Sequence, residues 1–291
     1  MSVISEIMEI QEFATLPPVA AKVLMLLEND DVDIRDISHV IETDASLTMK
    51  LLRVANSPIY AIRTQISSIH QAILTLGLNR LTNIVIGVSI FSRFLMNTQK
   101  QALDFMEKFW WHSSCTGVIA KVLATKLKKQ YKEYEFIGGL LHDIGKLAMV
   151  QYNTNLYLDV LRLITEENYI DVDAEVKIFG VDHLEVGEKI FHLWKLPAEM
   201  SYIVSHHSKI EQLDQSQELV SIIRVADLLC EMWGAEINEG LEQIKISDDI
   251  SWKVLCEKNP GLAELDVEKF TFDLENEFKK SKEFLNLLVQ E

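Results

Sequence analysis

The hydrophobic residues of this chain recur at three- and four-residue steps from end to end, the spacing of one face of an α-helix. We find no convincing stretch of strict alternation bounded by turn residues, which is the pattern of a half-buried strand. Only five prolines and eleven glycines interrupt the pattern, and most fall where a helix is expected to begin or end. The sequence therefore predicts an all-α protein.

The helices of the first third are predicted to be short. "LPPVAAKVLMLLEND" begins a helix just after Pro17 and Pro18. The next helix has Asp44 as its N-cap and stops at Asn56, and "SSIHQAILTLG" has a serine cap and Gly77 as its C-terminal signal. Helices this short are stable only when they pack together, so we expect a bundle.

We predict three regions along the chain. An N-terminal bundle of short helices over residues 13–100 packs on a second helical domain over 101–245. Amphipathic packing helices follow over 246–291, where charged and apolar residues alternate. The boundary between the first two regions is the polar stretch "NTQKQ" near residue 100.

Charge and cysteine content limit the function classes. A net charge of −16 opposes binding to a phosphate backbone, so we expect no nucleic-acid partner. The most apolar segment, Leu81 to Met96, is broken by polar residues and predicts a buried helix without membrane insertion. Three cysteines without a CxxC pair, and an N-terminus unlike a signal peptide, predict a cytoplasmic protein without disulfides or a thiolate zinc site.

Histidines and aspartates on apolar helix faces are the candidates for chemistry. His112 lies in the apolar stripe of its helix, and Asp227 shares a face with Ile223 and Cys230. A buried carboxylate needs a cation, a donor network or a proton, and a metal is one such cation. Five predicted helices together supply five imidazoles and two carboxylates: His112, His142, Asp143, His183, His206, His207 and Asp227.

This residue mixture is a ligand set for Fe, Mn, Zn, Co or Ni, whereas Mg²⁺ and Ca²⁺ prefer mostly oxygen. Asp143 is the natural bridge between two metals, because a carboxylate has two oxygens. Such a pair can clamp a phosphate, and Lys146 could stabilise developing negative charge. We expect Gly145 to end the helix that carries His142 and Asp143.

Each residue taken alone has a simpler interpretation. A core histidine is more often hydrogen-bonded to a neighbour than bound to a metal. Asp227 could pair with Arg224, and His206 with His207 could form a polar helix end. Glu185 is better explained by a capping box with Asp182. Sequence patterns alone do not show that these groups converge.

The order of these residues resembles the HD superfamily of metal-dependent phosphohydrolases, most closely its HD-GYP branch, which hydrolyses cyclic di-GMP. The resemblance implies a site for two divalent transition-metal ions. It also implies that Lys146, in "HDIGK", binds a substrate phosphate, and that Lys146 and Asp143 are the catalytic residues if the protein is an enzyme. Four ligands are basic to the superfamily and three complete the pair: His112, His142, Asp143 and Asp227, then His183, His206 and His207.

The N-terminal third resembles a particular relative. "LPPVAAKVLMLLENDDVDIRDISHVIETDASLTMKLLRVANSPIY" is similar to the N-terminal helical part of the HDOD family, the HD-related output domain of bacterial signalling proteins. The similarity runs from about Phe13 to about Trp233 and is highly specific in its N-terminal pattern. It implies an HDOD helical subdomain over 13–100 and an HD-like subdomain with the candidate metal site over 101–245. Members of this family are mostly regarded as signalling or regulatory modules without demonstrated catalysis.

Two departures from the HD-GYP pattern shape the functional prediction. No glycine–tyrosine–proline loop follows His207, so the substrate of those enzymes does not carry over, and Lys108 stands where trinuclear members have a glutamate, so we expect two metals. We predict a regulatory protein that acts through a signalling partner and retains a dinuclear metal site. The sequence also leaves a homodimer possible. The alternative is a metal-dependent phosphohydrolase acting on a cyclic dinucleotide or nucleotide.

Overall fold

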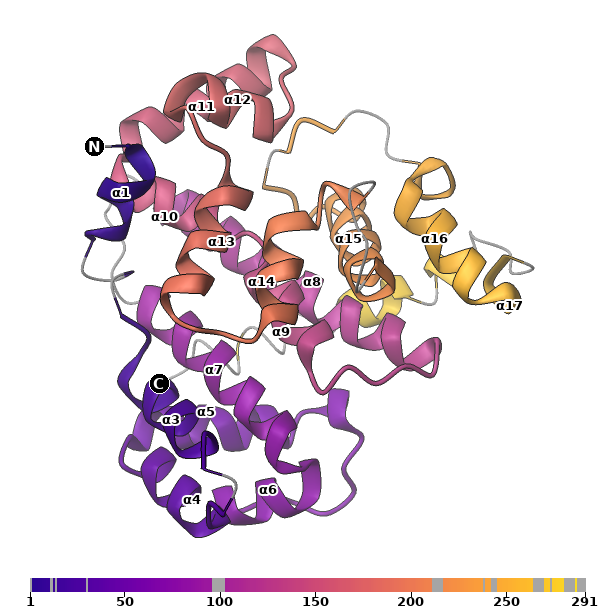
Figure 1. Cartoon of the computed structure of the whole chain (residues 1–291). Coiled ribbons are helices and arrows are strands. Elements are labelled where there is room, and N and C mark those ends of the chain that lie inside the picture. Colours follow the sequence, from indigo (N-terminus) through magenta and orange to yellow (C-terminus); the bar gives the residue numbers. More distant parts are fainter. Residues whose placement is uncertain are drawn as a thin grey trace. The chain divides into compact units, whose positions relative to one another are not determined.

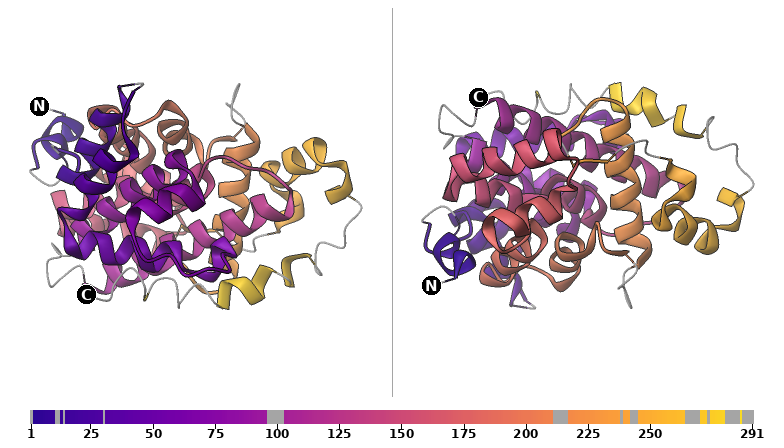
Figure 2. Two further views of the ribbon diagram at one scale, coloured as in Figure 1. Left: turned by 90° about the horizontal axis from the view of Figure 1, so that it is seen from below. Right: turned by 90° about the horizontal axis from the view of Figure 1, so that it is seen from above.

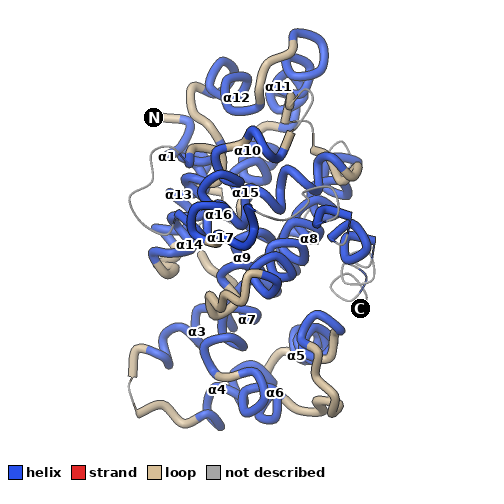
Figure 3. The backbone as a smooth tube through the Cα atoms, turned by 90° about the vertical axis from the view of Figure 1, so that its right-hand side faces the viewer, coloured by secondary structure: helices blue, strands red, loops and turns tan. Residues whose placement is uncertain are grey.

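The computed structural model describes the chain except for residues 1, 11–12, 14, 30, 96–102, 211–216, 238, 242–244, 264–269, 273, 280–285 and 287–291. Every regular element among the described residues is a helix, and Figure 3 shows no strand among them. The all-α prediction is therefore confirmed. In the described part of the chain, no helix has both the length and the apolar character needed to cross a bilayer.

The chain divides into two compact units. The smaller unit comprises Leu16–Asn97 with Lys282–Glu291, and the larger comprises Met1–Thr15 with Thr98–Ser281. The polar stretch that set the predicted boundary near residue 100 lies outside the described residues.

The smaller unit forms its helices where the sequence places caps. The Asp44 carboxylate accepts a hydrogen bond from the Leu47 amide at 2.9 Å, and Gly77 ends a helix with a φ of +90°. The predicted starts and stops in this unit are confirmed. Its elements (Figure 1) are α3 Pro18–Leu27, α4 Ile34–Glu42, α5 Ala45–Ala55, the 3₁₀ turn η1 Pro58–Tyr60, α6 Ile69–Leu76 and α7 Leu78–Leu95.

The larger unit is built around the long helix α8, against which α9 and α15 pack. Its elements are α1 Val3–Met8, α8 Leu103–Lys126, α9 Tyr134–Leu141, α10 Ile144–Tyr152, α11 Thr154–Glu167, α12 Asp171–Phe179, α13 His183–Leu193, α14 Ala198–His206, α15 Gln217–Met232, η4 Ile246–Asp248, α16 Ile250–Lys258 and α17 Pro260–Ala263.

Helices α8 and α9 approach closely because each presents a glycine to the other. A Cβ on Gly139 would lie 2.8 Å from the Cα of Gly117, a distance that a side chain does not tolerate. His112 lies upstream of Gly117 on α8, and His142 directly follows α9. The contact therefore brings Nε2 of His112 and Nε2 of His142 to 3.3 Å from each other.

The prediction that a helix ends at Gly145 is wrong. Helix α9 ends at Leu141, and α10 begins at Ile144 and continues through Gly145. Glycine is required there for space, because a Cβ would lie 1.9 Å from the carbonyl oxygen of His183. The histidine–aspartate pair therefore lies at the break between two helices.

The predicted C-terminal packing helices fall partly outside the described residues. Helix α16 packs beside α15 (Figures 1 and 2), and Trp252 and Leu255 bury their side chains in the core cluster around α15. Residues 270–272 and 274–279 are also helical, and Phe270, Leu274 and Phe278 join the same cluster.

Candidate metal centre

Six of the seven predicted ligands converge in the larger unit. Five of them belong to two groups whose donor atoms lie within 4.8 Å of one another: one group contains His112, His142 and Asp143, and the other contains Asp143, His183 and His207. The sixth, Asp227, lies directly beside His112. Both groups are buried. His112 comes from α8, His142 and Asp143 from the break between α9 and α10, His183 from the first turn of α13, His207 from the end of α14, and Asp227 from α15.

The four converging histidines are oriented in the same way, by a hydrogen bond from Nδ1. The Nδ1 of each ring faces an oxygen that can only accept, so Nδ1 carries a proton and donates it. This leaves the Nε2 lone pair directed at the centre, as in metal-binding histidines generally. The acceptors are the carbonyl of Ala235 for His112 at 2.7 Å, of Gly139 for His142 at 2.8 Å and of Val204 for His207 at 3.2 Å, and the Glu175 carboxylate for His183 at 2.7 Å.

Asp143 connects the two groups. Its Oδ1 lies 3.4 Å from Nε2 of His183 and 3.3 Å from Nε2 of His207, whereas its Oδ2 lies 3.3 Å from Nε2 of His142. On the side of His142, Asp227 places its Oδ1 3.1 Å from Nε2 of His112. One carboxylate thus presents an oxygen to each group, as a bridging ligand does.

These contacts need a cation between the partners. A neutral imidazole whose Nδ1 holds the proton faces a carboxylate oxygen with a lone pair, and two acceptors do not bond to each other. Oδ1 of Asp143, Oδ1 of Asp227 and Nε2 of His183 are buried atoms without a hydrogen-bond partner. Ligands about 2.1 Å from a tetrahedral metal lie about 3.4 Å apart, which matches the separations here. The donor set therefore fits a transition metal.

The charge balance points the same way. Among the described residues, five carboxylates of buried residues at and around the centre face two cationic side chains, and Glu231 adds a sixth carboxylate 3.6 Å from Nδ1 of His112. Acidic groups therefore outnumber basic ones, and bound divalent ions would offset the excess. The carboxylates are Asp143, Asp171, Glu175, Asp227 and Glu239, and the cations are Lys146 and Arg224.

Neighbouring carboxylates raise the pKa values of two of the converging histidines. Burial opposes a proton on His112, but the hydrogen bond and charge of Asp227 outweigh it and raise its pKa to about 9. Burial likewise opposes a proton on His183, and the Glu175 carboxylate outweighs it and raises the pKa to about 9. His207 differs, because burial dominates and lowers its pKa to about 4. The centre attracts cations, whether protons or metals.

Lys146 is placed differently from a freely presented phosphate ligand. Its Nζ lies 3.0 Å from Oδ2 of Asp143, 2.8 Å from Oδ2 of Asp171 and 3.4 Å from Oε1 of Glu239. The side chain is 1% exposed. In this conformation the ammonium group neutralises carboxylates of the protein itself, and its role towards a substrate stays a prediction.

His206 is not among the converging residues. Its ring stacks on Tyr202 with the centroids 4.5 Å apart, and its Nδ1 lies 2.7 Å from the Ser205 hydroxyl. Consecutive residues of a helix point about 100° apart, so His206 and His207 cannot both face one point from a regular helix.

The two neighbouring histidines therefore form a matched pair for a test. We expect His207→Ala to lower the bound metal by at least one equivalent per chain, because its Nε2 faces Asp143. His206→Ala should retain the full content, since its ring contacts only Tyr202 and Ser205 in the described structure. Elemental analysis of the two purified variants measures this, and equal losses in both would contradict the placement of the rings.

Sequence reasoning missed three acidic residues around the centre. Asp171 and Glu175 lie four residues apart on α12 with Ala174 buried between them, a signal that an inward-facing acidic pair can give. Glu239 lies in an irregular segment outside the helical pattern, where buried Ala235 and Ile237 alternate with exposed Glu236 and place Glu239 on the buried side.

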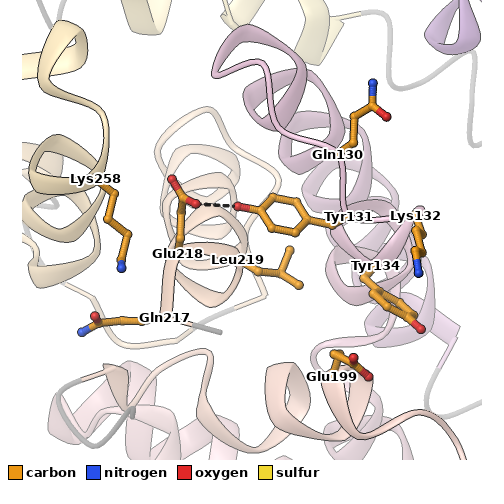
Figure 4. Close-up of a pocket in the computed structure, with 9 residues that line it drawn as sticks. All are labelled: Gln130, Tyr131, Lys132, Tyr134, Glu199, Gln217, Glu218, Leu219 and Lys258. Carbon is orange, nitrogen blue, oxygen red and sulfur yellow. Dashed lines mark hydrogen bonds between the residues drawn. The ribbon is translucent and has the colours of Figure 1, made fainter. Parts of the chain in front are cut away.

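A separate hollow of about 390 Å³ lies elsewhere in the larger unit, and none of the predicted ligands lines it. Figure 4 shows the Tyr131 hydroxyl donating to Glu218 across it, with Lys258 on the facing helix. Glu218 is also paired with Lys129 at 2.7 Å and accepts from Asn259, so its carboxylate is engaged within the protein, and we take the buried cluster as the candidate site.

Comparison with known proteins identifies relatives with this architecture. The HDOD domain profile matches residues 13–210. An HDOD domain protein of unknown function from Geobacter sulfurreducens has a TM-score of 0.75 at 24% identity, over 95% of this chain and 93% of that one. A proposed phosphohydrolase from Shewanella amazonensis SB2B has a TM-score of 0.72 at 20% identity, over 99% and 98%. At these identities the likeness shows that both structures have the same fold as this chain.

A curated relative adds a comparison by sequence. An uncharacterized protein of Treponema pallidum is 25% identical over 221 residues, which is 75% of this chain. The match spans 42% of the length of that relative.

Proposed function

The chain belongs to the HDOD family, and from this membership we propose that it is a regulatory signal-transduction protein that acts through a protein partner. In this proposal the larger unit retains a dinuclear centre for divalent transition metals, Fe, Mn, Zn, Co or Ni. We propose a cytoplasmic location on the basis of the three free thiols, with no nucleic-acid partner.

The residues divide between the two ions by their grouping. His112, His142 and Asp143 would hold one ion, with Asp227 beside His112 and an oxygen of Glu239 also within reach, and Asp143, His183 and His207 would hold the other. Bound ions would supply the positive charge that the buried carboxylates lack. Because the ligands come from α8, α9, α13, α14 and α15, occupancy would fix the positions of these helices relative to one another.

The observation that carries this proposal is that the metal-ligand side chains are together and shielded from solvent. Each of the six converging ligands is at most 1% exposed. An ion can enter through small fluctuations, but a nucleotide needs an open pocket. Lys146 is held by three carboxylates of the protein, which further favours a structural or sensory centre.

A phosphohydrolase acting on a cyclic dinucleotide or nucleotide is the second candidate. Lys146 and Arg224 favour it, because they place two cations directly beside the donor set. In such an enzyme these cations would hold the phosphate, and Asp143 would fix the two groups of metal ligands relative to each other.

A turnover assay on metal-loaded protein separates the two functions. We expect no hydrolysis of cyclic di-GMP, cyclic di-AMP or bis(4-nitrophenyl) phosphate above the rate of an Asp143→Ala variant, since the ligands are shielded from a substrate of this size. Turnover that requires metal and disappears in Asp143→Ala would favour the second candidate instead.

A further inference from the structure

His183 differs from the other converging histidines in the acceptor of its Nδ1 proton. Its Nδ1 donates to Oε2 of Glu175 at 2.7 Å, whereas the other three rings donate to backbone carbonyls. Nδ1 of His112 also has a carboxylate nearby, but Oε1 of Glu231 is 3.6 Å away, beyond hydrogen-bond distance. A carboxylate on Nδ1 makes the opposite ring nitrogen a stronger ligand, so Nε2 of His183 gains affinity for a metal from Glu175.

The same oxygen of Glu175 also holds the backbone of His183. Oε2 accepts a hydrogen bond from the His183 amide at 2.8 Å. This amide belongs to the first residue of α13, where a helix amide has no partner within its own helix. Gly180 follows α12 with a φ of +75°, and the turn brings Glu175 back to the start of α13. One oxygen therefore fixes both the backbone and the ring of a metal ligand.

The charge of Glu175 exceeds what helix capping requires. The side chain is fully buried, and its Oε1 is a buried atom without a hydrogen-bond partner. Burial raises the pKa of Glu175, and the charge and hydrogen bond of His183 oppose that rise. A cap needs an acceptor alone, which a neutral side chain supplies at a lower desolvation cost. A cation on the far side of the imidazole ring accounts for a charged residue here, whereas capping does not.

We propose that Glu175 is a positioning residue of the metal centre, and that its charge sets how tightly the ion of the group with His183 and His207 is bound. The inference rests on the proposed metal centre and states what controls the occupancy of one of its two positions. The other group has carbonyl acceptors behind both of its histidines, so its ion binds independently of Glu175. Helix α12 thus controls one ion without supplying a ligand to it.

Metal titration of Glu175→Gln tests this proposal. Glutamine keeps the length of the side chain and an acceptor oxygen for both N–H groups but removes the charge. One of the two equivalents should therefore bind about 10- to 100-fold more weakly than in the wild type. The other equivalent should keep its affinity. Calorimetry with Zn²⁺ on chelator-stripped protein gives both affinities, and circular dichroism of the same samples reports the fold.

Asp182→Asn is the matched control at the same helix start. The Asp182 carboxylate accepts from the Glu185 amide at 2.9 Å and pairs with Lys209 at 2.7 Å, so its charge is balanced away from the His183 ring. Asparagine caps a helix as well as aspartate does, and the lost ion pair is partly exposed. Both equivalents should therefore bind within about fivefold of the wild type.

The visible absorption of the Co²⁺-loaded protein is a readout that a capping role would not change. The bands of Co²⁺ depend on the donor strength of its ligands. They should shift in Glu175→Gln and keep their positions in Asp182→Asn.

Proton NMR of the Zn²⁺-loaded wild type needs no variant. The Nδ1 proton of His183 should resonate at lower field than those of the other three ligand histidines, because it alone among them is bonded to a carboxylate in the described structure. Four protons at similar positions would contradict a charged Glu175 even if Glu175→Gln fails to fold.

The outcomes separate this inference from the metal centre itself. Two equivalents with wild-type affinities and an unchanged Co²⁺ spectrum in a folded Glu175→Gln would overturn the role of Glu175 and leave the centre intact. Equal weakening of both equivalents would also overturn it, because the charge would then act on the centre as a whole. Wild-type protein that takes up no metal would overturn the centre and this inference together.

Discussion

Replacing Asp143 with asparagine is expected to remove most of the metal-dependent stabilisation of the protein. Asparagine keeps the shape of the side chain but has one oxygen and no charge, so it cannot serve both groups. Metal at about a thousandfold excess over Kd stabilises a folded protein by about 4 kcal/mol per site. For a unit of this size, two such sites raise Tm by more than about 10 °C. We expect less than about a third of that shift in Asp143→Asn.

The metal-free variant gives an independent check. Asparagine cannot replace the charge that pairs with His142 and the buried Lys146, which together outweigh burial and lower the pKa of Asp143. Metal-free Asp143→Asn should therefore be less stable than the metal-free wild type, and the metal-dependent shift is measured from each protein's own metal-free state. Asp159→Asn is the matched control, because the side chain of Asp159 is 44% exposed and its one ion pair among the described residues is with Arg162. Full metal-dependent stabilisation in Asp143→Asn would show that Asp143 does not connect the groups.

Adding one methyl group at Gly145 is expected to be among the most destabilising small changes in the chain. A Cβ at this position would lie 1.9 Å from the carbonyl oxygen and 2.7 Å from the carbonyl carbon of His183. Both atoms are backbone, so no side-chain rotation relieves the clash, and α10 must move away from α13. We expect Gly145→Ala to lower the free energy of unfolding by about 3 kcal/mol. Denaturant titration of the metal-free protein measures this loss.

The same variant should also weaken metal binding, because the displacement separates Asp143 from His183. Gly261→Ala is the matched control: Gly261 lies in helix α17, a Cβ there meets nothing within 4 Å, and the change should leave stability within about 1 kcal/mol of the wild type. Wild-type stability and metal affinity in Gly145→Ala would contradict the close approach of α10 and α13.

Local signals made the helical fold predictable. The helix boundaries at Asp44 and Asp182 follow from capping chemistry, which depends only on neighbours in sequence. The break between His142 and Ile144 was not predictable in this way. It depends on the space between α10 and the first turn of α13, which no local pattern records.

The candidate site was predictable where its residues belong to regular helices. His112 and Asp227 occupy apolar faces, so their burial followed from periodicity, and both are fully buried. Glu239 reaches the centre from an irregular segment, where the helical periodicity that placed His112 and Asp227 gives no direction. Sequence reasoning placed both His206 and His207 at the centre, whereas helix geometry allows only one of two consecutive residues to face it, and the structure shows that this one is His207.

Elemental analysis of protein purified without chelators, from cells supplied with transition metals, tests the central claim most directly. Asp143 presents one oxygen to His142 and the other to His183 and His207, so the account predicts two equivalents of transition metal per chain. Less than about a tenth of an equivalent would contradict it, because the buried lone pairs of the centre would then be balanced by protons alone.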